Sequence, residues 1–70
     1  MPANEIRIDG EIYQVVIGRD PDRGGYSIEC PTVPGSFAHG MTVKEAIENV
    51  EKEIRNKLTV RQQYMNRKRP

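Results

Sequence analysis

The stretch PTVPGSFAHGMTVKEAIENVEKEIRNKL (residues 31–58) decides the fold, because a strand pattern gives way to a helical pattern within it. Residues 36–40 (SFAHG) predict a short strand with Phe37 and Ala38 on opposite faces. From residue 43 onward, apolar side chains recur at the spacing of an amphipathic helix. This stripe consists of Val43, Ala46, Ile47, Val50, Ile54 and Leu58. A strand followed by such a helix indicates an α+β protein whose helix covers one face of a sheet.

The start of the predicted helix carries a capping box made by Thr42 and Glu45. We expect the Thr42 hydroxyl to accept the backbone N–H of Glu45, and the Glu45 carboxylate to accept the N–H of Thr42. The opposite face of the helix pairs acids with bases at the favourable i,i+4 spacing. These pairs are Glu48 with Lys52, Glu51 with Arg55, and Glu53 with Lys57.

The segment before the helix is interpreted as a structural corner. Pro31 and Pro34 cannot donate ladder hydrogen bonds, so the preceding strand must end near Cys30. Gly35 and Gly40 permit backbone turns that other residues resist. The corner is expected to change the direction of the chain so that Phe37 packs and Thr42 caps the helix.

Working toward the N-terminus, Asp9-Gly10 lies between two apolar runs and predicts a tight β-hairpin. Its strands are expected at residues 6–8 and 11–18. The longer strand places Tyr13, Val15 and Ile17 on one face and Ile12, Gln14 and Val16 on the other. Residues 26–30 (YSIEC) alternate strictly and predict another strand, with Tyr26, Ile28 and Cys30 on one face. The expected fold is a three- to four-stranded antiparallel sheet with one helix on one face, in β-β-β-β-α or β-β-β-α order.

Composition narrows the class of protein. Seventy residues allow one domain, assigned to residues 1–60, followed by a basic tail at 61–70 that contains Arg67, Lys68 and Arg69. One cysteine and one histidine exclude an internal disulfide and disfavour a zinc site built by one chain, so no cofactor or metal is expected. A net charge of +1 is not that of a dedicated nucleic-acid binder. Such a small core favours a homo-dimer or tetramer.

No apolar segment resembles a signal peptide or a membrane span, and the single cysteine fits a reducing compartment, so a cytoplasmic location without membrane contact is expected. Nothing in the spacing gives His39 the orienting partner and the nucleophile that catalysis needs, so the chain is predicted not to be an enzyme. Cys30 alternates with apolar residues and is interpreted as a small buried side chain.

Residues 13–54 (YQVVIGRDPDRGGYSIECPTVPGSFAHGMTVKEAIENVEKEI) resemble the HicB family of antitoxin-like proteins. The family commonly has a strand, an acidic and glycine-rich loop, a Pro-x-hydrophobic-Pro-Gly corner and a capped helix. The corner positions matched here are Pro31, Val33, Pro34, Gly35, Ser36, Phe37, His39, Gly40 and Thr42. Ser36 stands where many members have cysteine. The segment after the helix is too short for the DNA-binding domain of full-length HicB antitoxins.

The resemblance implies an antitoxin-type binding protein that neutralises a small basic RNA-cleaving toxin by occlusion, without a DNA-binding domain of its own. Candidate partner-binding residues are Asp20, Asp22, Glu29 and His39. The loop at residues 20–25 is either an acidic surface toward that toxin or an ordinary solvated loop. Two alternatives remain: an orphan homo-oligomeric domain of unknown ligand, and a weak RNA- or DNA-binding module.

Overall fold

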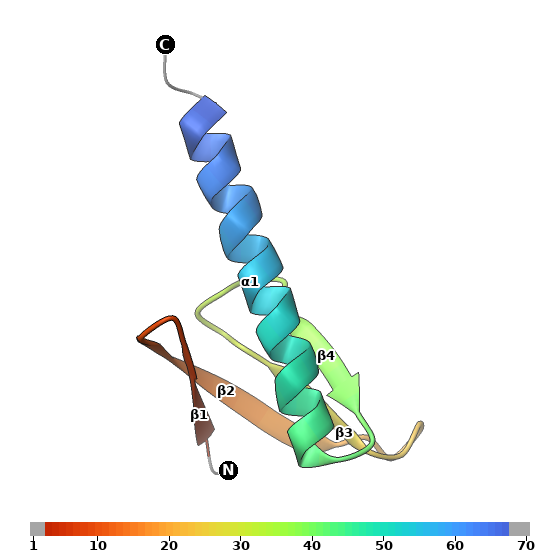
Figure 1. Cartoon of the computed structure of the whole chain (residues 1–70). Helices are drawn as coiled ribbons and strands as arrows, with labels where there is room; N and C mark the ends of the chain where they lie inside the picture. The colour runs from red at the N-terminus through yellow and green to blue at the C-terminus, as the bar shows by residue number, and fades with distance from the viewer. Residues whose placement is uncertain (1–2, 68–70) are drawn as a thin grey trace.

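The computed structural model describes residues 3–67, and it describes the side chains of residues 4–59. The elements along the chain are β1 (Ala3–Ile8), β2 (Glu11–Arg19), β3 (Tyr26–Glu29), β4 (Phe37–Gly40) and α1 (Val43–Arg67). The strands form one antiparallel sheet in the order β1-β2-β3-β4, and α1 crosses one face of it (Figure 1). The predicted α+β fold is therefore confirmed, with four strands.

The β1–β2 hairpin is closed by the predicted two-residue turn. Asp9 and Gly10 have φ angles of 51° and 83°, as a type I′ turn requires at its two central positions. The pairing continues without interruption from Ile8 opposite Glu11 to Ala3 opposite Val16. Strand β1 thus begins at Ala3, earlier than the sequence predicted.

The core lies between α1 and one face of the sheet. Its buried residues are Ile8, Val15, Ile28, Cys30, Val33, Ala46, Val50 and Ile54. Most of the predicted helical stripe is therefore correct, but Val43 is 40% exposed. Val43 lies in the first turn of α1, where the chain has only just left β4.

The prediction that Phe37 packs in the core is wrong, because its side chain is 63% exposed. The reason lies in the alternation of β4. Gly40 is buried and Ala38 is half-buried on the helix side, where only small residues allow α1 to approach the strand closely. Phe37 has the opposite parity and must lie on the other face of the sheet.

The capping box forms with one change. The backbone N–H of Glu45 donates to the Thr42 hydroxyl (3.1 Å). The Glu45 carboxylate accepts the N–H of Met41 (2.6 Å), one residue before the predicted donor. Of the predicted i,i+4 ion pairs, Glu51 with Arg55 forms at 3.0 Å. Among the described residues, the pairs Glu48 with Lys52 and Glu53 with Lys57 lie beyond ion-pair distance.

Helix α1 is longer than predicted and continues past Leu58 to Arg67. It therefore runs through residue 60, where the domain was expected to end. The side chains of the predicted basic tail, residues 61–70, lie outside the described part of the chain. No helix within residues 3–67 is both long and apolar enough to cross a membrane.

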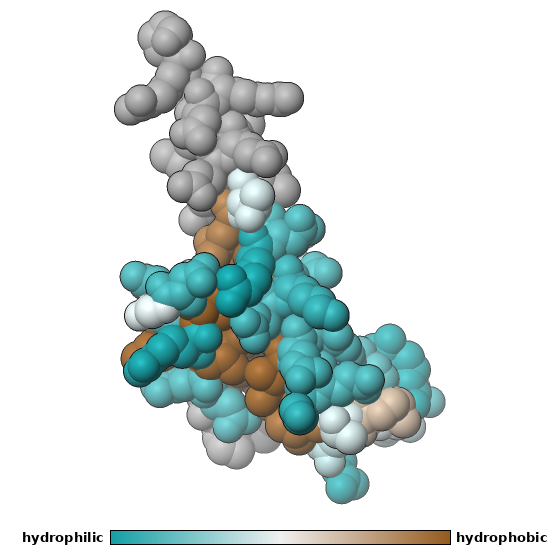
Figure 2. Space-filling model, viewed as in Figure 1, coloured by the Kyte–Doolittle hydropathy of each residue, from teal (hydrophilic) through white to brown (hydrophobic). Residues whose placement is uncertain are grey.

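Helix α1 packs mainly on β3 and β4 and leaves the helix side of β1 and β2 partly open. Figure 2, in the same view as Figure 1, shows a polar outer surface on α1 and apolar residues gathered beside it over β2. Ile6, Tyr13 and Ile17 are only half-buried on this side of the sheet.

Candidate partner-binding surface

The sheet face opposite α1, called the open face below, carries apolar side chains that are largely exposed. Ile12 is 55% exposed, Val16 39% and Phe37 63%. The strand register places Val16 opposite Glu29, and Glu29 opposite Phe37. Because directly opposite residues share a face of the sheet, these three side chains form one row across β2, β3 and β4. An acidic group thus lies between two apolar groups on this face.

A shallow depression of about 380 Å³ lies along this row. It is lined by Val16, Gly18, Arg23, Ser27, Ile28, Glu29, Phe37 and Ala38. Gly18 and Ser27 are opposite each other on the same face, two register positions from Val16 and Glu29. Since glycine and serine are small, the sheet is hollowed there between the larger side chains of the row.

Asp20, at the edge of the open face, accepts hydrogen bonds from the loop that follows it. Its carboxylate accepts the N–H groups of Asp22 (3.1 Å) and Arg23 (3.0 Å) and the Arg23 Nε–H (2.8 Å). The Ser27 hydroxyl donates to the same carboxylate at 3.3 Å. The Asp20 side chain is only 11% exposed. Asp20 is therefore engaged within the β2–β3 loop and organises it.

These hydrogen bonds act on the ionisation of Asp20. The Arg23 backbone N–H, followed by the Arg23 side chain, lowers the pKa of Asp20 from 3.8 to about 2. Both donors favour the charged carboxylate and together outweigh partial burial, which acts in the opposite direction. Asp20 therefore stays ionised wherever the protein is folded at moderate pH.

His39 closes the same loop from β4. Its Nε2 lies 2.7 Å from the Gly24 carbonyl, an acceptor, so Nε2 carries the proton and donates. The same nitrogen lies 3.9 Å from Asp20 Oδ2. Through the hydrogen bond to Gly24, His39 holds β4 against the β2–β3 loop.

Asp20, Ser27 and His39 are the residue types of a catalytic triad, but their order is different. Nucleophilic catalysis requires the imidazole to lie between the hydroxyl and the carboxylate. Here the Ser27 hydroxyl donates directly to Asp20, and His39 donates to a backbone carbonyl. The arrangement is typical of a loop held by hydrogen bonds.

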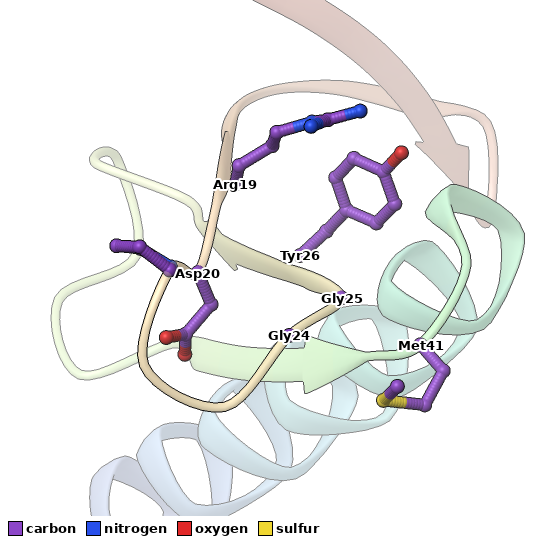
Figure 3. Close-up of a pocket in the computed structure, with 7 residues that line it drawn as sticks. Arg19, Asp20, Gly24, Gly25, Tyr26 and Met41 are labelled. Atoms are coloured by element: carbon purple, nitrogen blue, oxygen red, sulfur yellow. The ribbon is translucent and has the colours of Figure 1, made fainter.

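A second hollow, of about 480 Å³, lies beside the β2–β3 loop and the start of α1. Figure 3 shows the side chains of Arg19 and Tyr26 on one side of this loop, with the Asp20 carboxylate pointing away from them. Met41 lies across the hollow and is 61% exposed. The hollow is open, and its lining includes Arg19 and Asp20, whose charged groups point apart, together with Tyr26 and Met41.

Of the four predicted partner-binding residues, the structure places Glu29 and His39 on the open face and Asp20 at its edge. Asp22 is exposed in the loop. Arg23, which binds Asp20 and lines the depression, was not predicted from the sequence. The signal for it was the three-residue spacing between Asp20 and Arg23, because an aspartate side chain commonly accepts backbone N–H groups two and three residues further on. Whether any of these residues contacts a partner stays a prediction.

Within the described residues, no three histidine, cysteine or acidic side chains come together in a way that could hold a metal ion. Cys30 is buried, as predicted, and its sulfur lies 3.4 Å from the Thr32 hydroxyl.

The chain is similar in sequence to a known protein. The chain is 44% identical over 43 residues to the UPF0150 protein Ta0767 of Thermoplasma acidophilum. The match covers 61% of this chain and 61% of the length of that relative. No protein-family model matches the chain, and no solved structure matches it significantly. The sequence is thus similar to a UPF0150 protein across somewhat more than half of its length.

Proposed function

We propose that the chain is a HicB-like binding protein that neutralises a small RNA-cleaving toxin by covering the toxin's active surface. The resemblance of residues 13–54 to the HicB family supports this proposal. The observation that carries it is the row of Val16, Glu29 and Phe37 on a sheet face that α1 does not cover. A face of this kind offers a contact surface for a partner protein.

Neutralisation by occlusion needs affinity and correct placement, and the open face supplies features suited to both. Exposed apolar side chains on a small protein mark an interaction surface. The exposed Glu29 between them would compete with RNA phosphates for the basic groups of a ribonuclease. Because Asp20 is engaged within its own loop, Glu29 replaces it as the leading acidic contact.

The test requires a small basic protein encoded next to this chain's gene, and a neighbourhood without such a gene would count against the proposal. RNA cleavage by that protein is measured with the chain and with two open-face variants, Glu29→Lys and Phe37→Ser. We expect both variants to lose most of the inhibition while their melting temperatures stay near that of the parent, since both side chains are exposed.

The matched control is Glu48→Lys, an equal charge reversal on the exposed face of α1. It should inhibit the toxin as the parent chain does. Full inhibition by Glu29→Lys and Phe37→Ser would remove the open face from the interface. A neighbouring toxin that the parent chain neither binds nor inhibits would refute the proposal itself.

A further inference from the structure

The sheet has two edge strands, β1 and β4, and they differ in whether other parts of the chain contact their outer edge. The β4 edge is short, and Asn49 of α1 donates a hydrogen bond to the His39 carbonyl (2.7 Å) on it. Strand β1 has six residues, pairs with β2 without a bulge, and contains no proline. Among the described residues, no side chain bonds to the backbone of β1. A regular, uncovered edge strand is a template for pairing with another strand.

The hairpin turn determines which backbone groups of β1 are free. A two-residue turn closes on a pair of residues that exchange both hydrogen bonds, here Ile8 and Glu11. Because hydrogen-bonded and non-hydrogen-bonded pairs alternate, Ile6 also directs its N–H and C=O toward β2. Glu5 and Arg7 then direct theirs outward, away from the sheet. Their side chains are exposed and share the open face with Ile12, which is opposite Arg7.

We propose that β1 pairs antiparallel with β1 of a second copy of this chain, with Ile6 opposite Ile6 of the second copy. This register places Glu5 opposite Arg7 of the second copy, and the two-fold axis repeats the contact with the roles exchanged. The outward backbone groups of these residues form the new ladder. The two four-stranded sheets become one continuous eight-stranded sheet with both helices on the same side.

Charge selects this register among those that the backbone allows. Outward-facing residues must oppose each other, so the symmetric alternatives centred on these two residues are Glu5 opposite Glu5 and Arg7 opposite Arg7. Each alternative places like charges directly across the strands, which destabilises a sheet, whereas opposite charges stabilise it. Because Glu5 and Arg7 are two residues apart, each pairs with its opposite charge only in the register with Ile6 opposite Ile6.

The helix side of β1 also favours a second copy. Ile6 is half-buried, and it pairs with Tyr13, which is also half-buried on the helix side of the sheet. In the proposed register, Ile6 packs against Ile6 of the second copy across the non-hydrogen-bonded position, where side chains lie closest. The contact area between two short strands is small, so we expect dimerisation in the micromolar range. This inference does not depend on the proposed antitoxin function.

The experiment is a charge swap read out by sedimentation equilibrium across the micromolar range at low salt. Glu5→Arg alone and Arg7→Glu alone each turn two opposite-charge pairs into two like-charge pairs. We expect each to weaken dimerisation roughly ten-fold or more. The double variant Glu5→Arg/Arg7→Glu restores both pairs and should dimerise like the parent chain. Neither change places a charge directly opposite another charge on β2, because Glu5 is opposite Gln14 and Arg7 is opposite Ile12.

A second readout and a control keep the test decisive. Hydrogen exchange should show the amides of Glu5 and Arg7 becoming protected as the concentration rises, while Glu48→Lys on α1 leaves the association unchanged. A parent chain that is monomeric throughout the range would overturn the proposal. So would a dimer that tolerates the single charge reversals; loss of that dimer in Val16→Lys would place the interface on the open face instead.

Discussion

Gly40 lies directly against the first turn of α1: a Cβ atom at this position would come within 2.8 Å of Ala46 Cα. Real Cβ atoms do not approach other atoms so closely, and the obstacle is backbone that cannot rotate away. The absence of a side chain at Gly40 therefore determines how closely the helix can pack on β4.

Gly40→Ala should consequently destabilise the fold by at least about 2 kcal/mol, because α1 must move away from the strand. Urea unfolding measures the change. Gly18→Ala is the matched control, since nothing lies within 4 Å of a Cβ atom there. Equal stability of the two variants would contradict the close packing described for Gly40.

Thr42→Ala should lower the free energy of unfolding by about 1 kcal/mol, because the N–H of Glu45 loses its acceptor. Thr42→Ser keeps the hydroxyl and should cost much less. Thermal unfolding followed by circular dichroism distinguishes the two. If Thr42→Ser is as damaging as Thr42→Ala, the methyl group and not the cap carries the stability.

Ser36→Ala should raise stability, by up to about 1 kcal/mol, although serine and alanine differ by a single atom. Ser36 is 1% exposed, and its hydroxyl has no hydrogen-bond partner among the described residues. A buried polar group without a partner is unfavourable, and alanine removes it. Ser27→Ala is the contrast, since that hydroxyl donates to Asp20 and its loss should destabilise the loop. A clear loss of stability in Ser36→Ala would mean that the hydroxyl has a partner.

Stability at acid pH should depend on Asp20. Its pKa is lowered from 3.8 to about 2 in the folded chain, so the unfolded chain binds the proton more readily. The contribution of the charged carboxylate is therefore complete above about pH 4 and is lost as the pH falls through about 2. In Asp20→Asn the unfolding free energy should be lower at neutral pH and should fall less between these values.

The control for this titration is Asp22→Asn, because the Asp22 side chain makes no hydrogen bond among the described residues. Its pH profile should follow that of the parent chain. Unfolding by urea at a series of pH values provides the data. Parallel profiles for the parent and Asp20→Asn would show that Asp20 is not the group responsible.

The local features of the fold could be predicted because their causes lie within a few residues. Asp9-Gly10 adopts positive φ angles that few other pairs tolerate, so the hairpin and its register follow directly. Thr42 and Glu45 are three residues apart and cap the helix wherever it packs. The alternation in β2 correctly separated the buried Val15 from the exposed Ile12 and Val16.

The candidate surface was only partly predictable. Glu29 and His39 lie on the open face, but the sequence alone did not reveal that Asp20 is engaged within its own loop. Its partners Arg23 and Ser27 come from the following loop and from β3, and their approach depends on how that loop closes. The length of α1 was also underestimated, because the apolar stripe ends at Leu58 while the backbone helix continues to Arg67.

The sequence by itself determined the order of the strands, the turn, the cap and which residues share a face, because these depend on backbone sterics and on alternation over short distances. Only the tertiary structure decided that α1 lies over β3 and β4, since that position depends on the fit between Gly40 and Ala46. With α1 there, Phe37 is left on the open face and the edge of β1 is left uncovered. The surfaces available to partners are thus the ones that a single helix does not cover.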